Sequence, residues 1–252
     1  MRKLGFLIFL LSGFLILSHA NEMDSVISKA NAYYADGFYL EAIDTYKEVL
    51  NHGYISADIY YNIGNAYFKL KNTPYAILYY ERALALQPEH EDARHNLTLA
   101  NAYIMDKIDY IPDIFIKRWK YAVVNSLLPK VWLIISLSAF SLFLLLFLTY
   151  FFSTRIVLKK FGFWFGVLFF LISVFTLLNS RERREIIQNS NKAIIISPVV
   201  TVKSSPNESG TNLFVLHEGT KVSMEDKLGN WTEIKIADGN KGWVKSEDFE
   251  EI

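Results

Sequence analysis

Two long uncharged apolar runs constrain this chain more than any other feature. Residues 131–152 hold no charged side chain over 22 positions, and residues 161–178 hold none over 18. An α-helix rises about 1.5 Å per residue, so the longer run can cross a hydrocarbon core about 30 Å thick. A buried hairpin of a soluble domain is the alternative, but neither run offers a charged face to water. The sequence therefore predicts two transmembrane helices.

A short basic segment, residues 153–160, joins the two runs. Its three cations favour the cytoplasmic side of a membrane. Within the second run, Gly162 and Gly166 stand four positions apart, a spacing that lets two helices pack closely. A chance pair of glycines near a helix end is the alternative.

The first 20 residues resemble a secretory leader. Arg2 and Lys3 precede an apolar stretch that ends in Ser18-His19-Ala20, with small residues at the two positions that a signal peptidase reads. We expect residues 1–20 to be a cleaved signal peptide, with an uncleaved anchor as the alternative. Export of the region after the leader agrees with a cytoplasmic loop at 153–160, although basic residues at 117–130 and 181–184 then lie outside, against the usual charge rule.

The chain is neutral only as a sum of unlike parts. Its 26 basic and 26 acidic side chains are distributed so that residues 21–116 hold seven basic and fourteen acidic groups. An acidic surface repels phosphate, so a nucleic-acid partner is not expected. The absence of cysteine excludes a disulfide scaffold, a thiolate metal site and a cysteine nucleophile.

The region before the membrane runs is internally repetitive, with a period of about 34 residues. Two amphipathic helices are predicted in each unit, over 24–36 and 39–51 and then over 57–70 and 73–86. The residues that recur are Asn31 and Asn65, Tyr33 and Tyr67, Ala42 and Ala76, Tyr46 and Tyr80, and Leu50 and Leu84. A polar-faced helix from Asp92 to Met105 is predicted to cap the second unit.

These residues resemble the tetratricopeptide repeat. The second unit carries the family signature, and the first departs from it at Ala30 and Tyr54, where the family has glycine and proline. The signature residues are Ile63, Gly64, Tyr67, Ala76, Tyr80, Ala83 and Pro88. The resemblance implies a short solenoid over 21–107, made of two repeats and a capping helix.

The resemblance also implies a peptide-binding groove on the first helix of each unit. Amides there can pair with a bound backbone and aromatic rings can pack on it, although simple solvation is an equal alternative. The predicted groove residues are Asn31, Tyr34, Asn62, Asn65, Phe68 and Asn96. A clamp for a terminal carboxylate is not favoured, because its cationic positions are occupied here by Ile27, Asp92 and Asn96.

Two connecting segments flank the membrane runs. Residues 108–130 are amphipathic, with Phe115, Trp119 and Tyr121 among cations, which predicts a helix at the membrane interface; a plain linker is the alternative. Residues 179–196 are interpreted as a linker.

Residues 197–252 are predicted to form a small all-β barrel of five short strands. The segments 218–222, 230–234 and 238–244 resemble the bacterial SH3-like domain, SH3b. The resemblance implies binding of cell-wall peptides or proteins, for which Trp231 and Trp243 are the candidate surface. Both tryptophans also suit the core of the barrel, the interpretation that we favour from sequence alone.

The order of these parts, together with Ile108-Asp109-Tyr110-Ile111-Pro112, resembles the BatE family of the Bacteroides aerotolerance operon. The resemblance implies a membrane assembly with partners that carry von Willebrand factor A domains. It also implies a role in aerotolerance.

The sequence favours a multidomain membrane protein without enzymatic activity. It contains no G-x-S-x-G, phosphate loop or H-E-x-x-H, and no cofactor is predicted. No metal site is expected at His90 and His95, because they are five positions apart and a metal pair on one helix face needs three or four. We expect a scaffold that binds protein partners through its repeats, at the bacterial inner membrane with both soluble regions in the periplasm. The alternative function is a peptidoglycan anchor that acts through SH3b.

Overall fold

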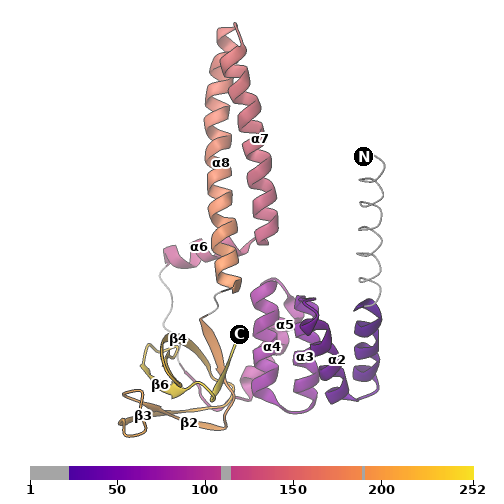
Figure 1. Cartoon of the computed structure of the whole chain (residues 1–252), viewed down its shortest axis with the longest axis vertical. Helices are drawn as coiled ribbons and strands as arrows, with labels where there is room; N and C mark the ends of the chain where they lie inside the picture. Colours follow the sequence, from indigo (N-terminus) through magenta and orange to yellow (C-terminus); the bar gives the residue numbers. More distant parts are fainter. Residues whose placement is uncertain (1–22, 109–114, 189–190) are drawn as a thin grey trace, which may run out of the picture. The chain divides into compact units, whose positions relative to one another are not determined.

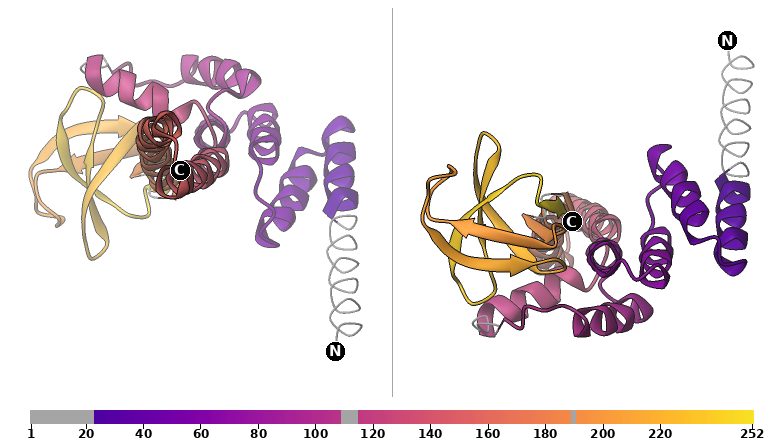
Figure 2. Two further views of the ribbon diagram at one scale, coloured as in Figure 1. Left: turned by 90° about the horizontal axis from the view of Figure 1, so that it is seen from above. Right: turned by 90° about the horizontal axis from the view of Figure 1, so that it is seen from below.

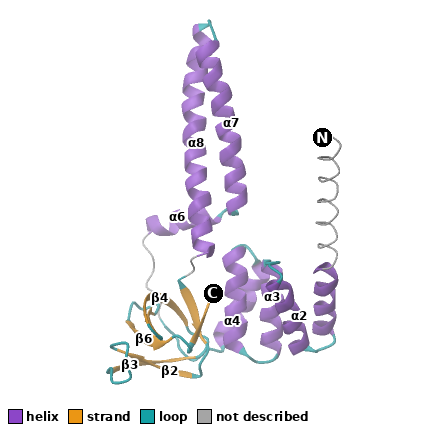
Figure 3. Cartoon of the chain, viewed as in Figure 1, coloured by secondary structure: helices purple, strands orange, loops and turns teal. Residues whose placement is uncertain are grey.

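The computed structural model describes residues 23–108, 115–188 and 191–252. The predicted signal peptide lies outside these residues, as does most of the motif at 108–112. The chain divides into two units, one formed by Met1–Tyr110 with Asn191–Ile252 and the other by Ile111–Ser190. Helices make up the repeat region and the second unit, and strands make up the C-terminal region (Figure 3).

The repeat region is a row of antiparallel helices (Figures 1 and 2). Residues 23–35 are helical. The next helices are α2 (Tyr39–Asn51), α3 (Ala57–Lys69), α4 (Thr73–Leu86) and α5 (Glu91–Ala102). The four repeat helices agree with the sequence prediction to within one or two residues, and the capping helix ends earlier, at Ala102 instead of Met105.

Side-chain caps fix where several of these helices begin. Ser56 accepts a hydrogen bond from the Ile59 N–H, and Asn72 accepts one from the Tyr75 N–H. The ring of His90 does the same for the Ala93 N–H. Each cap satisfies a backbone donor that has no partner within its helix.

The core of the repeats depends on small residues next to large ones. Tyr80 is fully buried, and its ring lies so close to Gly64 that a Cβ there would come within 2.7 Å of it. Ala76 and Ala83 are also fully buried. Only a residue without a side chain fits at position 64, which explains the glycine of the repeat signature.

The C-terminal region is an antiparallel sheet of seven strands in the order β3-β2-β6-β5-β4-β1-β7. The strands are β1 (Lys192–Ile195), β2 (Val199–Lys203), β3 (Asn212–His217), β4 (Lys221–Leu228), β5 (Trp231–Lys235), β6 (Lys241–Lys245) and β7 (Phe249–Glu251). Their inward residues, among them Val202, Val222, Ile234 and Val244, form a buried core. The sequence prediction found five strands and missed the outer pair, β1 and β7.

The linker predicted at 179–196 is wrong over most of its length. Helix α8 continues to Gln188, and β1 begins at Lys192. The charged residues at 181–185 end the apolar run but not the helix. The apolar pattern therefore did not indicate that α8 continues to Gln188. The apolar part of β1 is only three residues long, too short to show an alternating pattern.

In the described part of the second unit there are three helices, α6 (Phe115–Asn125), α7 (Pro129–Phe152) and α8 (Ile156–Gln188). Helices α7 and α8 run side by side (Figure 1). Both are long and apolar enough to cross a membrane, and in each only about a fifth of the most apolar window is buried. The remaining apolar side chains face outward, which suits a lipid environment and suggests membrane association.

The architecture therefore matches the predicted fold class. It comprises a helical repeat region, two candidate membrane helices and a small antiparallel β domain.

Candidate functional site

The second repeat contains a buried tyrosine bound to two asparagines. The Tyr80 hydroxyl donates to Asn65 Oδ1 at 2.8 Å, and Asn96 Nδ2 donates to the same oxygen at 2.8 Å. Asn65 comes from α3, Tyr80 from α4 and Asn96 from α5. Because the oxygen of Asn65 is occupied, the amide nitrogen of the same side chain is the group that remains to donate outward.

The first repeat contains the same arrangement one repeat period earlier. The Tyr46 hydroxyl donates to Asn31 Oδ1 at 2.5 Å, and the Asn62 side chain also hydrogen-bonds Tyr46. We call the two sets, Asn31–Tyr46–Asn62 and Asn65–Tyr80–Asn96, the Tyr–Asn–Asn triads. All four predicted groove asparagines belong to them.

Burial keeps both triad hydroxyls protonated. It raises the pKa of Tyr46 to about 12, with a further increase from the neighbouring Tyr34. Burial likewise raises the pKa of Tyr80. Both hydroxyls therefore act as donors at any physiological pH, and they hold the asparagine side chains in fixed orientations.

The two predicted aromatic residues lie near the triads, half-buried. The Tyr34 ring packs edge-on to Tyr39, with 5.4 Å between the ring centroids. The Phe68 ring packs edge-on to Tyr103 at 6.1 Å, and Tyr103 is 73% exposed. The sequence analysis did not identify Tyr103. This residue follows the capping helix, and its exposed ring adds apolar surface beside Phe68.

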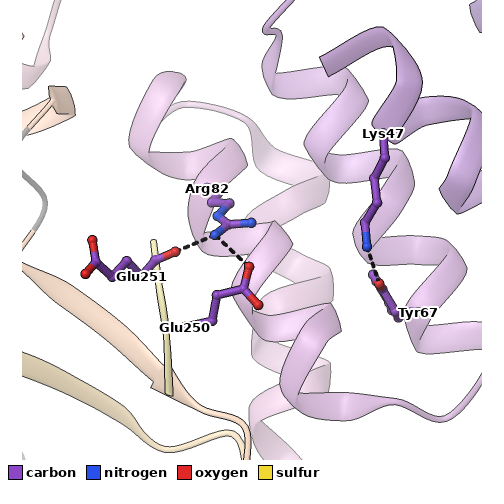
Figure 4. Close-up of polar contacts among 5 residues, drawn as sticks. All are labelled: Lys47, Tyr67, Arg82, Glu250 and Glu251. Atoms are coloured by element: carbon purple, nitrogen blue, oxygen red, sulfur yellow. Dashed lines mark hydrogen bonds and ion pairs between the residues drawn. The ribbon is translucent and has the colours of Figure 1, made fainter. Parts of the chain in front are cut away.

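A second network links helices α2, α3 and α4 of the repeats, and Figure 4 shows part of it. Lys47 Nζ donates to the Tyr67 hydroxyl at 2.9 Å. Lys47 also lies 5.9 Å from the centroid of the Tyr79 ring, and the guanidinium of Arg82 lies 5.1 Å from that centroid. These cation–π contacts link α2 to α4.

Arg82 continues this network into the β domain. It donates to Glu250 Oε1 at 3.2 Å and to the Glu251 carbonyl at 2.5 Å (Figure 4). Lys221 forms an ion pair of 2.6 Å with Glu81 of α4. In addition, Ile194 of β1 belongs to the buried core of the repeats.

Asp106 forms the densest polar contact between the repeats and the β domain. Its carboxylate accepts from the His217 N–H at 2.7 Å and from the Thr220 hydroxyl at 2.7 Å, and its other oxygen lies 2.8 Å from His217 Nδ1. Burial acts to raise the pKa of Asp106, but the hydrogen bonds from His217 and Thr220 outweigh it and hold that pKa below its usual value. The repeats and the β domain thus contact each other although a long stretch of chain, including both apolar helices, separates them.

The β domain has a polar pocket of about 590 Å³ beside Trp231. Lys245 and Glu208 form an ion pair of 2.8 Å in its wall. A neighbouring hollow of about 340 Å³ shares Trp231 and extends to Lys203. Trp231 and Trp243 are both half-buried, and neither belongs to the buried core cluster that the sequence interpretation favoured for them.

The predicted glycine pair lies in α8, on the side that packs against α7, and both glycines are buried. A Cβ at Gly162 would lie 2.8 Å from the Leu146 carbonyl oxygen, whereas one at Gly166 would make only ordinary contacts at 3.8 Å. Ser136 and Ser173 also bond across the helices, each hydroxyl donating to the other residue's carbonyl at 2.9 and 3.0 Å. Such bonds between backbones that approach closely suit helices packed in lipid.

Within the described ranges, no three His, Asp or Glu side chains are grouped to hold a metal ion. His90 instead caps α5 and pairs with Asp58 at 3.3 Å.

Two parts of the chain match known families. Residues 57–90 match the tetratricopeptide repeat, and residues 198–250 match the bacterial SH3 domain. These matches and the fold define a class of membrane-associated protein with two binding modules. The repeat suggests interaction with protein partners, and the SH3 domain suggests binding of peptidoglycan. Two candidate membrane helices accompany them. None of the curated proteins compared with the chain is significantly similar to it.

Proposed function

We propose that this protein is a non-enzymatic, membrane-anchored scaffold that binds protein partners through its repeats in a bacterial envelope complex. The observation that carries the proposal is the pair of Tyr–Asn–Asn triads. Each triad fixes its asparagines through a buried tyrosine, so the amides are preorganised before a ligand arrives. The half-buried ring of Phe68 and the exposed ring of Tyr103 supply apolar contact beside them.

The partner segment is a neutral or basic peptide bound along the first helices of the repeats. Fixed amide donors suit the carbonyl groups of an extended or helical backbone. The acidic charge of residues 21–116 disfavours an acidic peptide. Resemblance to the BatE family gives membrane proteins with von Willebrand factor A domains as candidate partners and aerotolerance or stress resistance as the setting.

We also propose that both soluble regions face the periplasm from the inner membrane. The contacts of Asp106 with His217 and of Arg82 with Glu250 support this arrangement, because two regions in contact must lie on one side of a bilayer. The basic residues at 153–160 support a cytoplasmic loop. Since the chain has no cysteine, one thiol introduced at Ser209 and another at Ser153 in separate variants can be tested with a membrane-impermeant reagent. Labelling at 153 rather than 209 in spheroplasts would contradict the arrangement.

Crosslinking in native membranes tests the groove. A photoreactive amino acid in place of Tyr103 should capture a partner protein, and Asn65→Ala with Phe68→Ala should abolish the capture. Asn65→Asp is the sharper variant, because it keeps the acceptor for Tyr80 and removes the amide donor. Asn51→Ala with Leu40→Ala is the matched control on α2, where both residues are exposed. Capture that persists in Asn65→Asp and in the double variant would remove the groove from the proposal.

The pocket beside Trp231 supports a second function, binding of peptidoglycan. It places an aromatic wall next to Lys245, Lys203 and Glu208, a combination that suits the carboxylates and amines of a cell-wall peptide. Trp231→Leu with Lys245→Gln should release the detergent-solubilised chain from isolated cell wall and leave partner capture intact. If the variant sediments with cell wall as the parent chain does, the pocket is not the binding site.

A further inference from the structure

Helix α6 separates apolar and basic side chains onto different faces. Successive helical residues are rotated by about 100°, so Phe115, Ile116 and Trp119 share one face. These three side chains are 78%, 73% and 63% exposed, respectively. A continuous apolar surface of this kind calls for a covering environment.

Basic side chains border that face on both sides. Arg118 and Lys120 flank the apolar stripe, and Lys117 lies on the opposite side of the helix, with its Nζ 5.9 Å from the centroid of the Tyr121 ring. An apolar stripe with basic flanks is typical of helices that lie in the plane of a membrane surface.

One short connection and two contacts hold α6 at the ends of the two apolar helices. Only residues 126–128 separate α6 from α7, and Trp132 Nε1 of α7 donates to the Val124 carbonyl at 3.3 Å. Lys120 forms an ion pair of 2.7 Å with Glu182, in the polar end of α8. Helix α6 is therefore fixed where α7 and α8 leave their apolar segments.

We propose that α6 lies in the bilayer–water interface and binds the headgroups of anionic phospholipids through Arg118 and Lys120, the two cations that border its apolar face. The occupant is lipid rather than protein because the apolar face is continuous along the chain with a candidate membrane helix, and its basic border matches phosphate. The proposal also gives a role to cations that the charge rule would place in the cytoplasm. It rests on α7 and α8 crossing a membrane, and it is independent of the partner bound by the repeats.

Fluorescence quenching in nanodiscs tests the proposal on the full chain. Ile116→Cys introduces the sole thiol, to which bimane is attached. The bilayer mixes phosphatidylcholine and phosphatidylglycerol at equal fractions, and either one or the other carries brominated acyl chains. We expect strong quenching at position 116 and at least about twofold more quenching by brominated phosphatidylglycerol than by brominated phosphatidylcholine, because basic residues concentrate anionic lipid.

The variants separate insertion from lipid recognition. Arg118→Gln with Lys120→Gln should equalise the two lipids while quenching itself persists. Lys159→Gln with Lys160→Gln makes the same charge change in the loop between α7 and α8 and should leave the preference intact. A label at Tyr121→Cys, on the basic side of the helix, should be quenched less than one at position 116.

Two outcomes would overturn the proposal. Absence of quenching at position 116 would show that α6 does not enter the bilayer. Equal quenching by the two lipids in the parent chain would show that the basic residues do not select anionic headgroups. Neither outcome bears on crosslinking of the repeats, so this proposal and the scaffold proposal can fail separately.

Discussion

The two repeats contain the same polar triad, but the helices beside it pack differently. Asn31, Tyr46 and Asn62 recur one period later as Asn65, Tyr80 and Asn96, with each tyrosine bound to its own asparagines. Helix packing beside the triads differs, because Ala30 occupies the position of Gly64. Ala30 is fully buried, so the first repeat accommodates a methyl group where the second has no space for one. The family match covers the second repeat. The comparison teaches that the triad does not depend on the signature glycine.

The largest expected loss of stability comes from adding a side chain at Gly64, where the second repeat packs most closely against Tyr80. Gly64→Val should destabilise α3 and α4 by about 3 kcal/mol, because its side chain would overlap the buried Tyr80 ring. Hydrogen exchange of α3 and α4 amides in the micelle-bound full chain measures the loss. Ala30→Gly is the control and should cost only about 2 kcal/mol, through lower helix propensity and the loss of one buried methyl group. Equal effects at the two positions would contradict the difference in packing.

Removing the triad hydroxyls should give a smaller and graded loss. Tyr80→Phe should cost about 1.5 kcal/mol, because it removes one of the two hydrogen bonds to the oxygen of half-buried Asn65 and leaves only the bond from Asn96. Tyr46→Phe should cost about 1 kcal/mol, since exposed Asn31 can turn to water. Exchange rates of α4 and α2 amides distinguish the two variants. A larger loss from Tyr46→Phe would reverse the ranking that burial predicts.

The helix caps provide a third test, with effects of about 1 kcal/mol or less. Asn72 caps α4, and its counterpart in the first repeat is Phe38, which makes no side-chain cap for α2. Asn72→Ala should weaken the first turn of α4 by about 1 kcal/mol, and Phe38→Asn should strengthen that of α2 by about half as much. Amide exchange in each first turn measures both changes. No gain in Phe38→Asn would mean that the Phe38 ring, packed against Tyr33, contributes as much as a cap.

Asp106 follows Asn72 by one further period, and it contacts the β domain instead of capping a helix. Its pKa is lowered in the fold, so its contribution to stability is complete above the usual value of 3.8 and is lost as pH falls through the lowered pKa. Protection of the His217 amide, corrected for intrinsic exchange, should therefore fall below about pH 4. In Asp106→Asn the protection should not change with pH over this range. This is the smallest of the four effects, because the repeats and the β domain also contact each other through Ile194 of β1 in the buried core of the repeats.

Sequence reasoning recovered features that local pattern or periodicity encodes. The repeat period identified Tyr46 and Tyr80 as equivalent, and the family resemblance pointed to the four asparagines. It did not show that these residues bond to each other, because a period gives equivalence rather than distance. The apolar runs gave both candidate membrane helices, although not the full length of α8.

The features that escaped prediction join distant parts of the chain. The Arg82–Glu250 pair spans 168 positions and the Asp106–His217 contact spans 111. Neither Arg82 nor Asp106 belongs to a motif, and each is an ordinary surface charge until the fold places a partner beside it. Trp231 and Trp243 escaped prediction for a different reason. Aromatic residues in short strands suit a core and a surface equally, and only the packed sheet shows that both tryptophans are half-buried.

Helix α8 extends without interruption from Ile156 to Gln188, a length of about 50 Å at about 1.5 Å per residue. That exceeds a hydrocarbon core by several turns, so its last part forms a rigid stalk. The sequence therefore places a helical segment of about a dozen residues, rather than a linker alone, between the apolar part of α8 and the β domain.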